Sequence, residues 1–229
     1  MRTIKQSWEF EGPAPDGSEI LRRIERAGRT CYKTEDRGGS IKDTMDFCKK
    51  LITSGHHSVL EHCNVSVRIV TDRGVTHEIV RHRLASYSQE STRYCNYSQD
   101  KFGNEITVIL PVWLDWDKIP ISFLPNHDVG HKLKFYKWQG AMEYAERYYF
   151  DLIQNGWSAQ EARSVLPNSL KTEIVMTANI REWRHFFTLR CSPKAHPQMR
   201  ELARSMCLGF QDVIPVLFDD IQDIVKNSI

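Results

Sequence analysis

The chain has 229 residues, of which 41% are hydrophobic and 26% charged, and its 31 basic and 29 acidic residues leave a net charge of +2. This composition predicts one large or two small folded domains, with a core that needs no disulfide or metal. It excludes a strongly cationic nucleic-acid coat, an acidic disordered tail and a fibrous chain.

No stretch approaches the apolar length of a membrane span, and the first residues mix charges without the apolar run of a signal peptide. We therefore expect a cytoplasmic protein with no membrane partner. The six cysteines are scattered and none has Cys-x-x-Cys spacing, so we expect reduced thiols rather than disulfides or a zinc site.

Three segments near the N-terminus have clear patterns. Residues 3–10 alternate loosely and predict one strand. Asp16 and Glu19 form a capping-box pattern ahead of apolar residues at helical spacing. Ser40 is expected to begin a second helix, which Gly55 ends. The apolar stripe of this second helix is Ile41, Met45, Cys48 and Ile52.

Strand and helix patterns continue along the rest of the chain. Residues 64–70 and 106–110 predict strands, and residues 131–154 predict a long helix. The later expected elements are a capped helix from Ser158 to before Pro167, a strand over 172–178 and a mostly helical stretch from Glu182 to about Lys226. Because strands and helices do not alternate regularly, we expect an α+β fold. We expect a single domain over residues 1–229. In it, helices flank a mainly antiparallel sheet, and the C-terminal half is helical.

One polar segment predicts a nucleotide site. The chain lacks the glycine-rich and Walker loops, the G-x-S-x-G elbow and the H-E-x-x-H motif, so a bound nucleotide would be held by side chains. Residues 81–94, RHRLASYSQESTRY, combine three arginines with a histidine, several hydroxyls and Gln89-Glu90. Guanidinium forks and hydroxyls suit phosphate oxygens, and an amide suits the edge of a base. The alternative is a solvated polar loop.

Residues 55–62, GHHSVLEH, allow three interpretations. Imidazole and carboxylate are competent zinc ligands, although their spacing here matches no common zinc motif. The ligands of such a site would be His56, His57, Glu61 and His62. The segment could also be a helix-capping turn, or His56 and Ser58 could meet a flat anionic ligand beside the arginine segment.

Residues 179–198, NIREWRHFFTLRCSPKAHPQ, predict a helix followed by a turn. In a helix, Arg181 and His185 share one side, since positions i and i+4 are neighbours. Arg190 would lie at the end of that helix and Arg163 at the end of another. Each is either a cation that the helix dipole favours or a ligand of phosphate.

These segments together resemble the flavin-dependent thymidylate synthases. Residues 81–94 match the family pattern R-H-R-x-x-S followed by S-x-R, and residues 55–62 resemble its histidine-containing turn. The stretch 162–167 resembles its substrate arginine segment, and residues 179–196 resemble its C-terminal signature. The pieces follow family order from about residue 27 to residue 200, so the resemblance covers most of the chain.

The resemblance implies an enzyme, a methyltransferase that converts dUMP to dTMP. Methylenetetrahydrofolate supplies the carbon and becomes tetrahydrofolate, and reduced FAD, which NADPH usually reduces, supplies the hydride. The protein's part is to bind and orient the substrate and cofactors and to provide the electrostatic environment, because the cofactors carry the difficult chemistry. No cysteine nucleophile is required. The family works as a homotetramer with FAD at subunit interfaces, and we expect the same here, with no nucleic-acid partner.

The resemblance also implies a role for each matching position. The cofactor-binding positions are Cys31, His56, Ser58, Glu61, Arg81, His82, Arg83, Leu84, Gln89, Asn179, Arg181 and His185. The substrate-binding positions are Glu78, Arg81, Gln89, Glu90, Ser91, Thr92, Arg93, Arg163 and Arg190. Arg190 is the expected catalytic residue, because a guanidinium at the uracil edge stabilises negative charge as the ring is activated. Glu78 and His185 stand where relatives carry an amide. Ser91 is expected to bind phosphate, since no neighbouring base in the sequence activates it as a nucleophile.

Two other functions compete with this one. A nucleic-acid module would use the arginines for phosphates and Tyr87, Tyr94 and Tyr97 for stacking, but the near-neutral charge argues against it. A metallohydrolase would centre on residues 56–62. Basic residues nevertheless outnumber acidic ones over residues 81–93 and 181–204. These two basic clusters have the size expected for binding small anionic cofactors and substrates.

Overall fold

A four-stranded antiparallel sheet carries most of the strand residues. In this computed structural model, which describes residues 1–34, 39–114 and 129–221, the strand order is β2-β3-β6-β4. The strands are β2 (Ser7–Phe10), β3 (Asn64–Asp72), β6 (Lys171–Asn179) and β4 (Ala85–Gln89). Along β3 every second residue is buried, including Val65, Val67 and Ile69, which confirms the strand predicted from alternation.

The first residues form two strands instead of the one predicted. β1 (Arg2–Ile4) leaves the main sheet and pairs in parallel with β5 (Thr107–Ile109), with Thr3 opposite Val108. Only β2 joins the four-stranded sheet. Alternation sets the period of a strand but does not name its partner, so the sequence alone could not separate the two.

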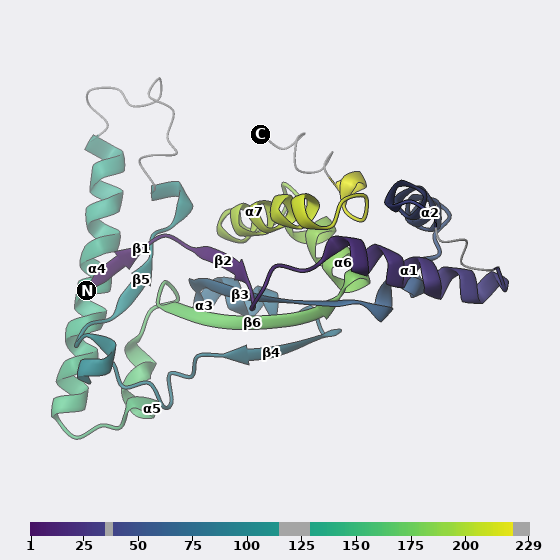
Figure 1. The fold of residues 1–229 in the computed structure, drawn as a ribbon. Helices are drawn as coiled ribbons and strands as arrows, with labels where there is room; N and C mark the ends of the chain where they lie inside the picture. Colours follow the sequence, from purple (N-terminus) through teal and green to yellow (C-terminus); the bar gives the residue numbers. More distant parts are fainter. Residues whose placement is uncertain (35–38, 115–128, 222–229) are drawn as a thin grey trace. The chain divides into compact units, whose positions relative to one another are not determined.

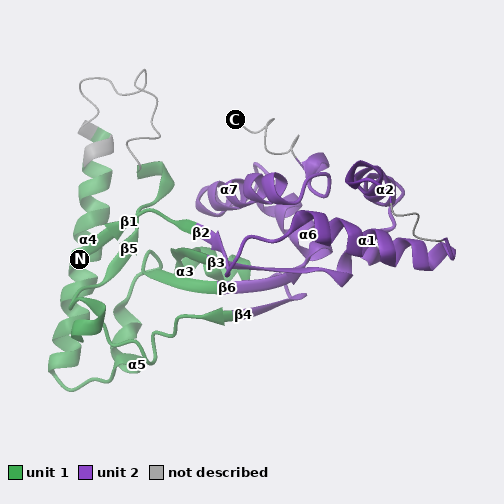
Figure 2. Ribbon diagram, viewed as in Figure 1, with its two compact units in different colours: residues 1–7, 69–79, 88–174 green, residues 8–68, 80–87, 175–229 purple. Residues whose placement is uncertain are grey.

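The chain divides into two compact units (Figure 2). Unit 1 comprises residues 1–7, 69–79 and 88–174, and unit 2 comprises 8–68, 80–87 and 175–229. Strands β3, β4 and β6 each begin in one unit and end in the other, so the backbone passes between the units within regular strands (Figure 1).

In unit 1 the helices enclose a small core. They are α3 (Arg73–Ile79), η2 (Asp100–Phe102), η3 (Val112–Leu114), α4 (Val129–Gln154), α5 (Ala159–Ala162) and η6 (Arg163–Val165). The core packs Tyr149 of α4 and Ala162 of α5 against Val108 of β5 and Leu170. The capping box predicted at Ser158 is present, and its helix is a short one.

In unit 2 the helices pack in two groups, α1 against α2 and α6 against α7. They are α1 (Gly17–Tyr32), α2 (Ile41–Thr53), η1 (His57–His62), α6 (Ile180–Arg190), α7 (Pro197–Val213) and η7 (Asp219–Ile221). The ring centroids of Trp183 and Phe187 of α6 lie 5.0 and 5.1 Å from that of Phe210 of α7. This aromatic packing explains why the C-terminal half is helical and buried on one side.

Two details of the N-terminal helices refine the predictions. Asp16 caps α1 by accepting the amide of Glu19, and Gly55 follows α2 with φ of 74°. The buried face of α2 is Thr44, Cys48 and Leu51. Cys48 of the predicted stripe is therefore buried, whereas Met45 and Ile52 are half-buried and Ile41 is exposed. Thr44 belongs to this face through a polar contact, because its hydroxyl donates to buried Glu25 at 2.6 Å.

Two predicted segments extend beyond the described part of the chain, namely the end of the C-terminal helical stretch at residues 222–226 and most of the loop before α4, residues 115–128. Within the described residues, no helix combines the length and the apolar character needed to cross a bilayer.

Candidate functional site

Unit 2 contains a cavity of about 540 Å³ next to the start of α6. Its lining residues are Glu61, Leu84, Asn179, Arg181, Glu182 and His185. Five of these six are positions that the sequence predicted for the cofactor. The structure therefore brings together residues from η1, from the segment before β4 and from the β6–α6 junction.

The first turn of α6 is fixed by its cap. Asn179 Oδ1 accepts the backbone N–H of Glu182 at 2.9 Å, which begins the helix at Ile180 and turns Arg181 and His185 toward the cavity. Arg181 Nη1 donates to Glu61 Oε1 at 2.6 Å, and both side chains are about half exposed. The cavity thus has a cation whose charge a carboxylate already balances.

A buried hydrogen-bonded chain lies beside this cavity. His82 is 4% exposed, and its Nδ1 donates to Glu182 Oε1 at 3.2 Å. Arg190 Nε donates to His82 Nε2 at 3.1 Å. The ring of His185 lies 5.6 Å from that of His82, edge to face. His82, the histidine of the R-H-R motif, therefore links the first turn of α6 to the arginine at the end of that helix.

The electrostatics of this chain fix its protonation. Burial, together with the nearby charge of Arg190 and the neighbouring His185, lowers the pKa of His82 to about 4. Burial also raises the pKa of the Glu182 carboxyl. His82 is therefore neutral at pH 7, with its proton on Nδ1 and its Nε2 lone pair facing Arg190. In this tautomer the neutral imidazole of His82 accepts the N–H of Arg190 Nε and so orients the guanidinium group.

His82, Glu182 and His185 also form the one group of three metal-ligand side chains found among the described residues. Their chemistry does not fit a metal ion. Both ring nitrogens of His82 are engaged, and the Arg190 guanidinium would repel a cation at that position.

The remaining cofactor positions of unit 2 lie outside the residues that line the cavity. Tyr32 Oη and His56 Nε2 are 3.1 Å apart, and Cys31 Sγ donates to the carbonyl of Ala27. Ser58, Arg81 and Arg83 are exposed. The structure does not bring these residues into the cavity beside α6.

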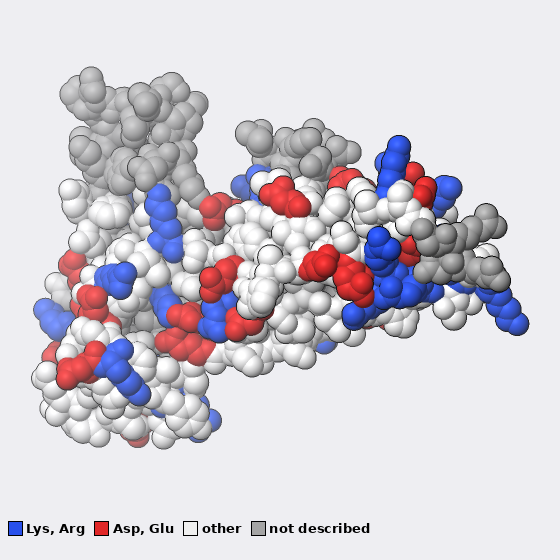
Figure 3. All heavy atoms as spheres, viewed as in Figure 1, with Lys and Arg blue, Asp and Glu red and all other residues white. Residues whose placement is uncertain are grey.

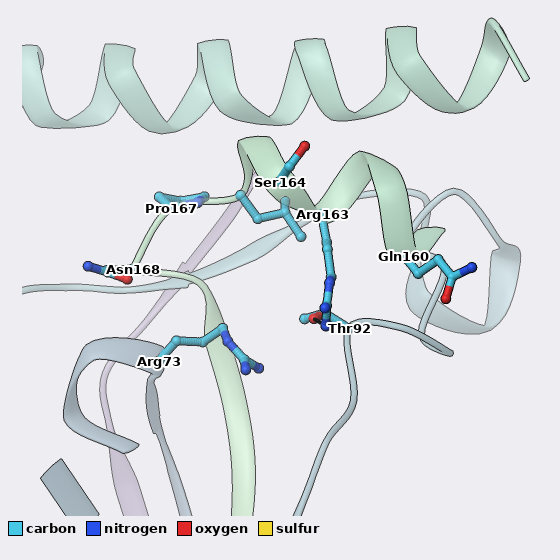
Figure 4. Close-up of a pocket in the computed structure, with 8 residues that line it drawn as sticks. Arg73, Thr92, Gln160, Arg163, Ser164, Pro167 and Asn168 are labelled. Atoms are coloured by element: carbon cyan, nitrogen blue, oxygen red, sulfur yellow. Dashed lines mark hydrogen bonds between the residues drawn. The ribbon is translucent and has the colours of Figure 1, made fainter. Parts of the chain in front are cut away.

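Unit 1 contains a second polar cavity of about 530 Å³, between the start of α3 and the α5–η6 segment. Its lining residues are Arg73, Thr92, Gln160, Arg163, Ser164, Leu166, Pro167 and Asn168. Figure 4 shows the guanidinium groups of Arg73 and Arg163 directed into the same space. Arg163 Nη1 donates to Thr92 Oγ1 at 3.3 Å, so two predicted substrate residues meet here.

Two other predicted substrate residues are engaged elsewhere in unit 1. Gln89 Nε2 donates to Thr76 Oγ1 at 3.0 Å and to Thr172 Oγ1 at 3.3 Å. Both carboxylate oxygens of Glu90 accept hydrogen bonds, from Tyr97 Oη at 3.0 Å and from Lys171 Nζ at 3.1 Å. Glu90 lines a different cavity, of about 330 Å³, together with Lys101 and Lys171 among others.

The rest of the arginine segment forms a turn. The Ser91 carbonyl accepts from the backbone of Tyr94 and Cys95, and Ser91 Oγ accepts the amide of Arg93 at 3.3 Å. Arg93 itself is exposed, with its guanidinium carbon 5.4 Å from the centre of the Tyr94 ring. Part of the segment is strand β4, so it is not simply a solvated loop. Glu78 lies in α3 and is half-buried.

A zinc site was one of the three interpretations of residues 55–62. Arg181 holds Glu61, and His57 Nε2 is 3.3 Å from the carbonyl of Ile52. The four side chains that such a site would use do not form a metal-ligand group among the described residues. The metal interpretation of residues 56–62 was therefore wrong.

The three tyrosines of the nucleic-acid interpretation do not form a common exposed surface on which bases could stack. The Tyr87 hydroxyl donates to the His82 carbonyl, and Tyr97 is only 6% exposed. Tyr94 is exposed. On the face shown in Figure 3, clusters of basic side chains lie beside acidic ones among uncharged residues. The described residues on that face therefore form no continuous basic stripe for a phosphate backbone.

The structure adds two residues that sequence reasoning missed. Arg73 lines the unit 1 cavity, and Glu182 holds His82 in unit 2. The signal for Glu182 was its place directly after Asn179-x-Arg181, but the helix dipole is a sufficient explanation for an acidic residue in the first turn of a helix. Arg73 gave no signal, because only the fold brings it next to Arg163.

Comparison with known proteins agrees with this arrangement. Residues 17–216 match the model of the family described as thymidylate synthase complementing protein. A flavin-dependent thymidylate synthase of Geobacter sulfurreducens is 34% identical over 214 residues, which cover 91% of this chain and 82% of that protein. A protein of the same name from Mycobacterium avium is 35% identical, covering 90% and 81%, and one from Corynebacterium diphtheriae is 32% identical, covering 96% and 85%. The chain therefore belongs to the thymidylate synthase complementing protein family.

Proposed function

We propose that this chain is a flavin-dependent thymidylate synthase that methylates dUMP to dTMP. Methylenetetrahydrofolate is the carbon donor and leaves as tetrahydrofolate, and NADPH reduces the flavin. The observation that carries the proposal is the pair of cavities, each lined by residues of the family pattern and each holding arginines. Family membership and the names of the relatives support the same reaction.

The cavity beside α6 fits part of a flavin nucleotide. Leu84, 74% exposed, offers an apolar surface to a flat ring, and Arg181 offers a guanidinium to a diphosphate. We assign FAD to this cavity, where it supplies the hydride when bound. The residues that hold it are Glu61, Leu84, Asn179, Arg181 and His185, with Cys31, His56, Ser58, Arg81, His82, Arg83 and Gln89 as further proposed contacts.

The phosphate of dUMP is assigned to the unit 1 cavity, and the hydrogen bond between Arg163 and Thr92 supports a shared role of these two residues in binding it. The other proposed contacts are Glu78, Arg81, Gln89, Glu90, Ser91 and Arg93. Arg190 is proposed to face the uracil edge, where its charge stabilises the electron density that develops when the ring is activated. Neutral His82 accepts the N–H of Arg190 Nε and so helps to fix the orientation of the guanidinium group.

The cysteines are poorly suited to attack uracil. Burial raises the pKa of Cys48 to about 12, and burial also raises the pKa of Cys63 and of Cys95. The Cys207 thiol has a pKa raised by its hydrogen bond with Cys191 and by burial. A protonated thiol is a weak nucleophile, and all six thiols, which lie in the described residues, are free. The proposed reaction requires no covalent attack by cysteine.

We also propose a homotetramer in which one domain per chain, residues 1–229, contributes to FAD sites at subunit interfaces. Supporting this, α4 exposes Leu133, Tyr136, Tyr144 and Tyr148, an apolar stripe at helical spacing that a partner subunit would cover. Light scattering of the purified protein tests the assembly. The cytoplasmic location stays a prediction from the sequence.

The decisive experiment is spectroscopic and chemical. We expect a yellow protein that releases FAD on denaturation and that releases tritium from 5-tritiated dUMP when methylenetetrahydrofolate and NADPH are present. A colourless protein that neither binds added FAD nor releases tritium would contradict the proposal.

A further inference from the structure

Arg73 is a half-buried cation with an unsatisfied nitrogen. Its Nη1 is buried and forms no hydrogen bond with any described residue. Buried polar atoms almost always have a partner, and a buried N–H donor of a charged group without one is costly. Figure 4 shows that this side chain points into the cavity it shares with Arg163.

The backbone holds Arg73 in this position. Its N–H donates to the carbonyls of Asn168 at 3.0 Å and Leu170 at 3.2 Å, and the Asp72 carboxylate accepts the N–H of Val75 at 2.7 Å. These bonds attach the start of α3 to the segment that follows Arg163. The two arginines, far apart in the sequence, are thus presented to one cavity by fixed backbone rather than by flexible loops.

The charge of the cavity is not balanced by its own walls. Among the described residues, no aspartate or glutamate lines it, and its other polar residues are neutral, namely Thr92, Gln160, Ser164 and Asn168. Two guanidinium groups that face one cavity repel each other unless an anion lies between them. A phosphate monoester carries close to two negative charges and accepts paired hydrogen bonds from each guanidinium fork.

We propose that Arg73 is a second arginine ligand of the 5′-phosphate of the nucleotide substrate and makes the site specific for a phosphate monoester. This inference rests on the proposed function, since Arg163 and Thr92 are the residues that assign dUMP to this cavity. It adds a residue that the family pattern in the sequence did not single out.

The test compares Arg73→Gln with Arg73→Lys and with Arg22→Gln, which removes the same charge from the exposed surface of α1. Loss of a charge-assisted hydrogen bond should raise the KM for dUMP about ten- to hundredfold in Arg73→Gln, with kcat nearly unchanged. Arg73→Lys should recover part of the loss, and Arg22→Gln should behave as wild type. Binding of deoxyuridine, which has no phosphate, should be equal in all four proteins.

Thermal unfolding separates a ligand role from a structural role. If Arg73 acts as a ligand, Arg73→Gln should leave the Tm of the unliganded protein unchanged or raise it, because the buried Nη1 that it removes has no hydrogen-bond partner among the described residues; removing a structural residue would lower the Tm. The rise in Tm that dUMP produces should shrink in Arg73→Gln. A KM equal to that of wild type, or a lower Tm with an unchanged response to dUMP, overturns the proposal.

Inorganic phosphate distinguishes failure of this inference from failure of the proposed function. A wild type that forms no dTMP contradicts the function alone. If phosphate then raises the Tm of wild type but not of Arg73→Gln, Arg73 is still an anion ligand. If phosphate stabilises both proteins equally or neither of them, Arg73 is not one.

Discussion

The arginines in and beside the two cavities have different partners. Beside α6, Arg181 is paired with Glu61, and Arg190 is held by neutral His82, whose other nitrogen donates to Glu182. Beside α3, Arg73 and Arg163 face a cavity that no carboxylate lines. The unit 1 cavity is therefore ready for an anion, whereas an anion that binds Arg181 must compete with a carboxylate. Their ligands should follow this difference: a small, highly charged phosphate in unit 1, and a larger, flatter nucleotide in unit 2.

The largest expected effect is on catalysis by Arg190. Arg190→Ala should lower the rate of dTMP formation by about 10²–10³-fold, the usual cost of removing one electrostatic stabiliser of a developing charge. Bound FAD should remain, because Arg190 is not among the residues that line the cavity beside α6. Tritium release and flavin absorbance measure the two quantities. Arg26→Ala, an exposed arginine of α1, is the control, and normal turnover of Arg190→Ala would refute the assignment.

The next effect is the pH dependence of unfolding. The pKa of folded His82, about 4, lies below the ordinary 6.5, so the unfolded chain takes up this proton first as the pH falls. The contribution of neutral His82 to the free energy of unfolding is fully present above pH 6.5. It is lost as the pH falls toward 4, and the total loss is about 3 kcal/mol. Denaturant titrations between pH 7 and pH 4 measure it.

The matched variants for that titration are His82→Gln and His62→Asn. The first removes the buried imidazole that faces Glu182, His185 and Arg190, and the second removes an exposed one. The slope with pH should fall in His82→Gln and persist in His62→Asn. Equal slopes in both variants would mean that His82 does not control this pH dependence.

A smaller effect is expected at Glu182, which we regard as a positioning residue. Glu182→Ala leaves the Nδ1–H of His82 buried without an acceptor and should cost about 1–3 kcal/mol of unfolding free energy. Glu182→Gln keeps an acceptor oxygen and should recover most of it. If Glu182 orients Arg190 through His82, kcat should follow the same order while the KM for dUMP stays constant. A KM that rises in both variants would break the proposed link.

The smallest effect concerns the exposed pair of Arg181 and Glu61. Its contribution to stability should be below about 1 kcal/mol and should decrease with added salt, since both side chains are about half exposed. A double-mutant cycle with Arg181→Ala and Glu61→Ala measures it. Arg181→Ala should still weaken FAD binding about tenfold, as expected for one lost charge-assisted hydrogen bond. Unchanged FAD affinity would remove Arg181 from the flavin site and weaken the comparison of the two cavities.

Local signals determined much of the secondary structure in advance. Alternation over residues 64–70 and 172–178 predicted β3 and β6, and the Ser40 and Ser158 patterns placed the starts of two helices. These features depend on residues within a few positions of each other, so a sequence shows them directly. The motif in residues 81–94 predicted the family as well, because its arginines and hydroxyls are specific in type and spacing.

Only the tertiary structure decided which charges are free to bind. In the sequence, residues 181–204 form a basic cluster, yet Arg184 forms an ion pair with Asp220, and Arg181 forms one with Glu61. Arg73 has no basic cluster around it in the sequence, yet the fold brings it beside Arg163 without a carboxylate in the cavity wall. The sequence determined the fold class, the family and the residue types of the site. Pairing between distant residues determined which of those charges are neutralised, because electrostatic energy depends on distances that local sequence does not encode.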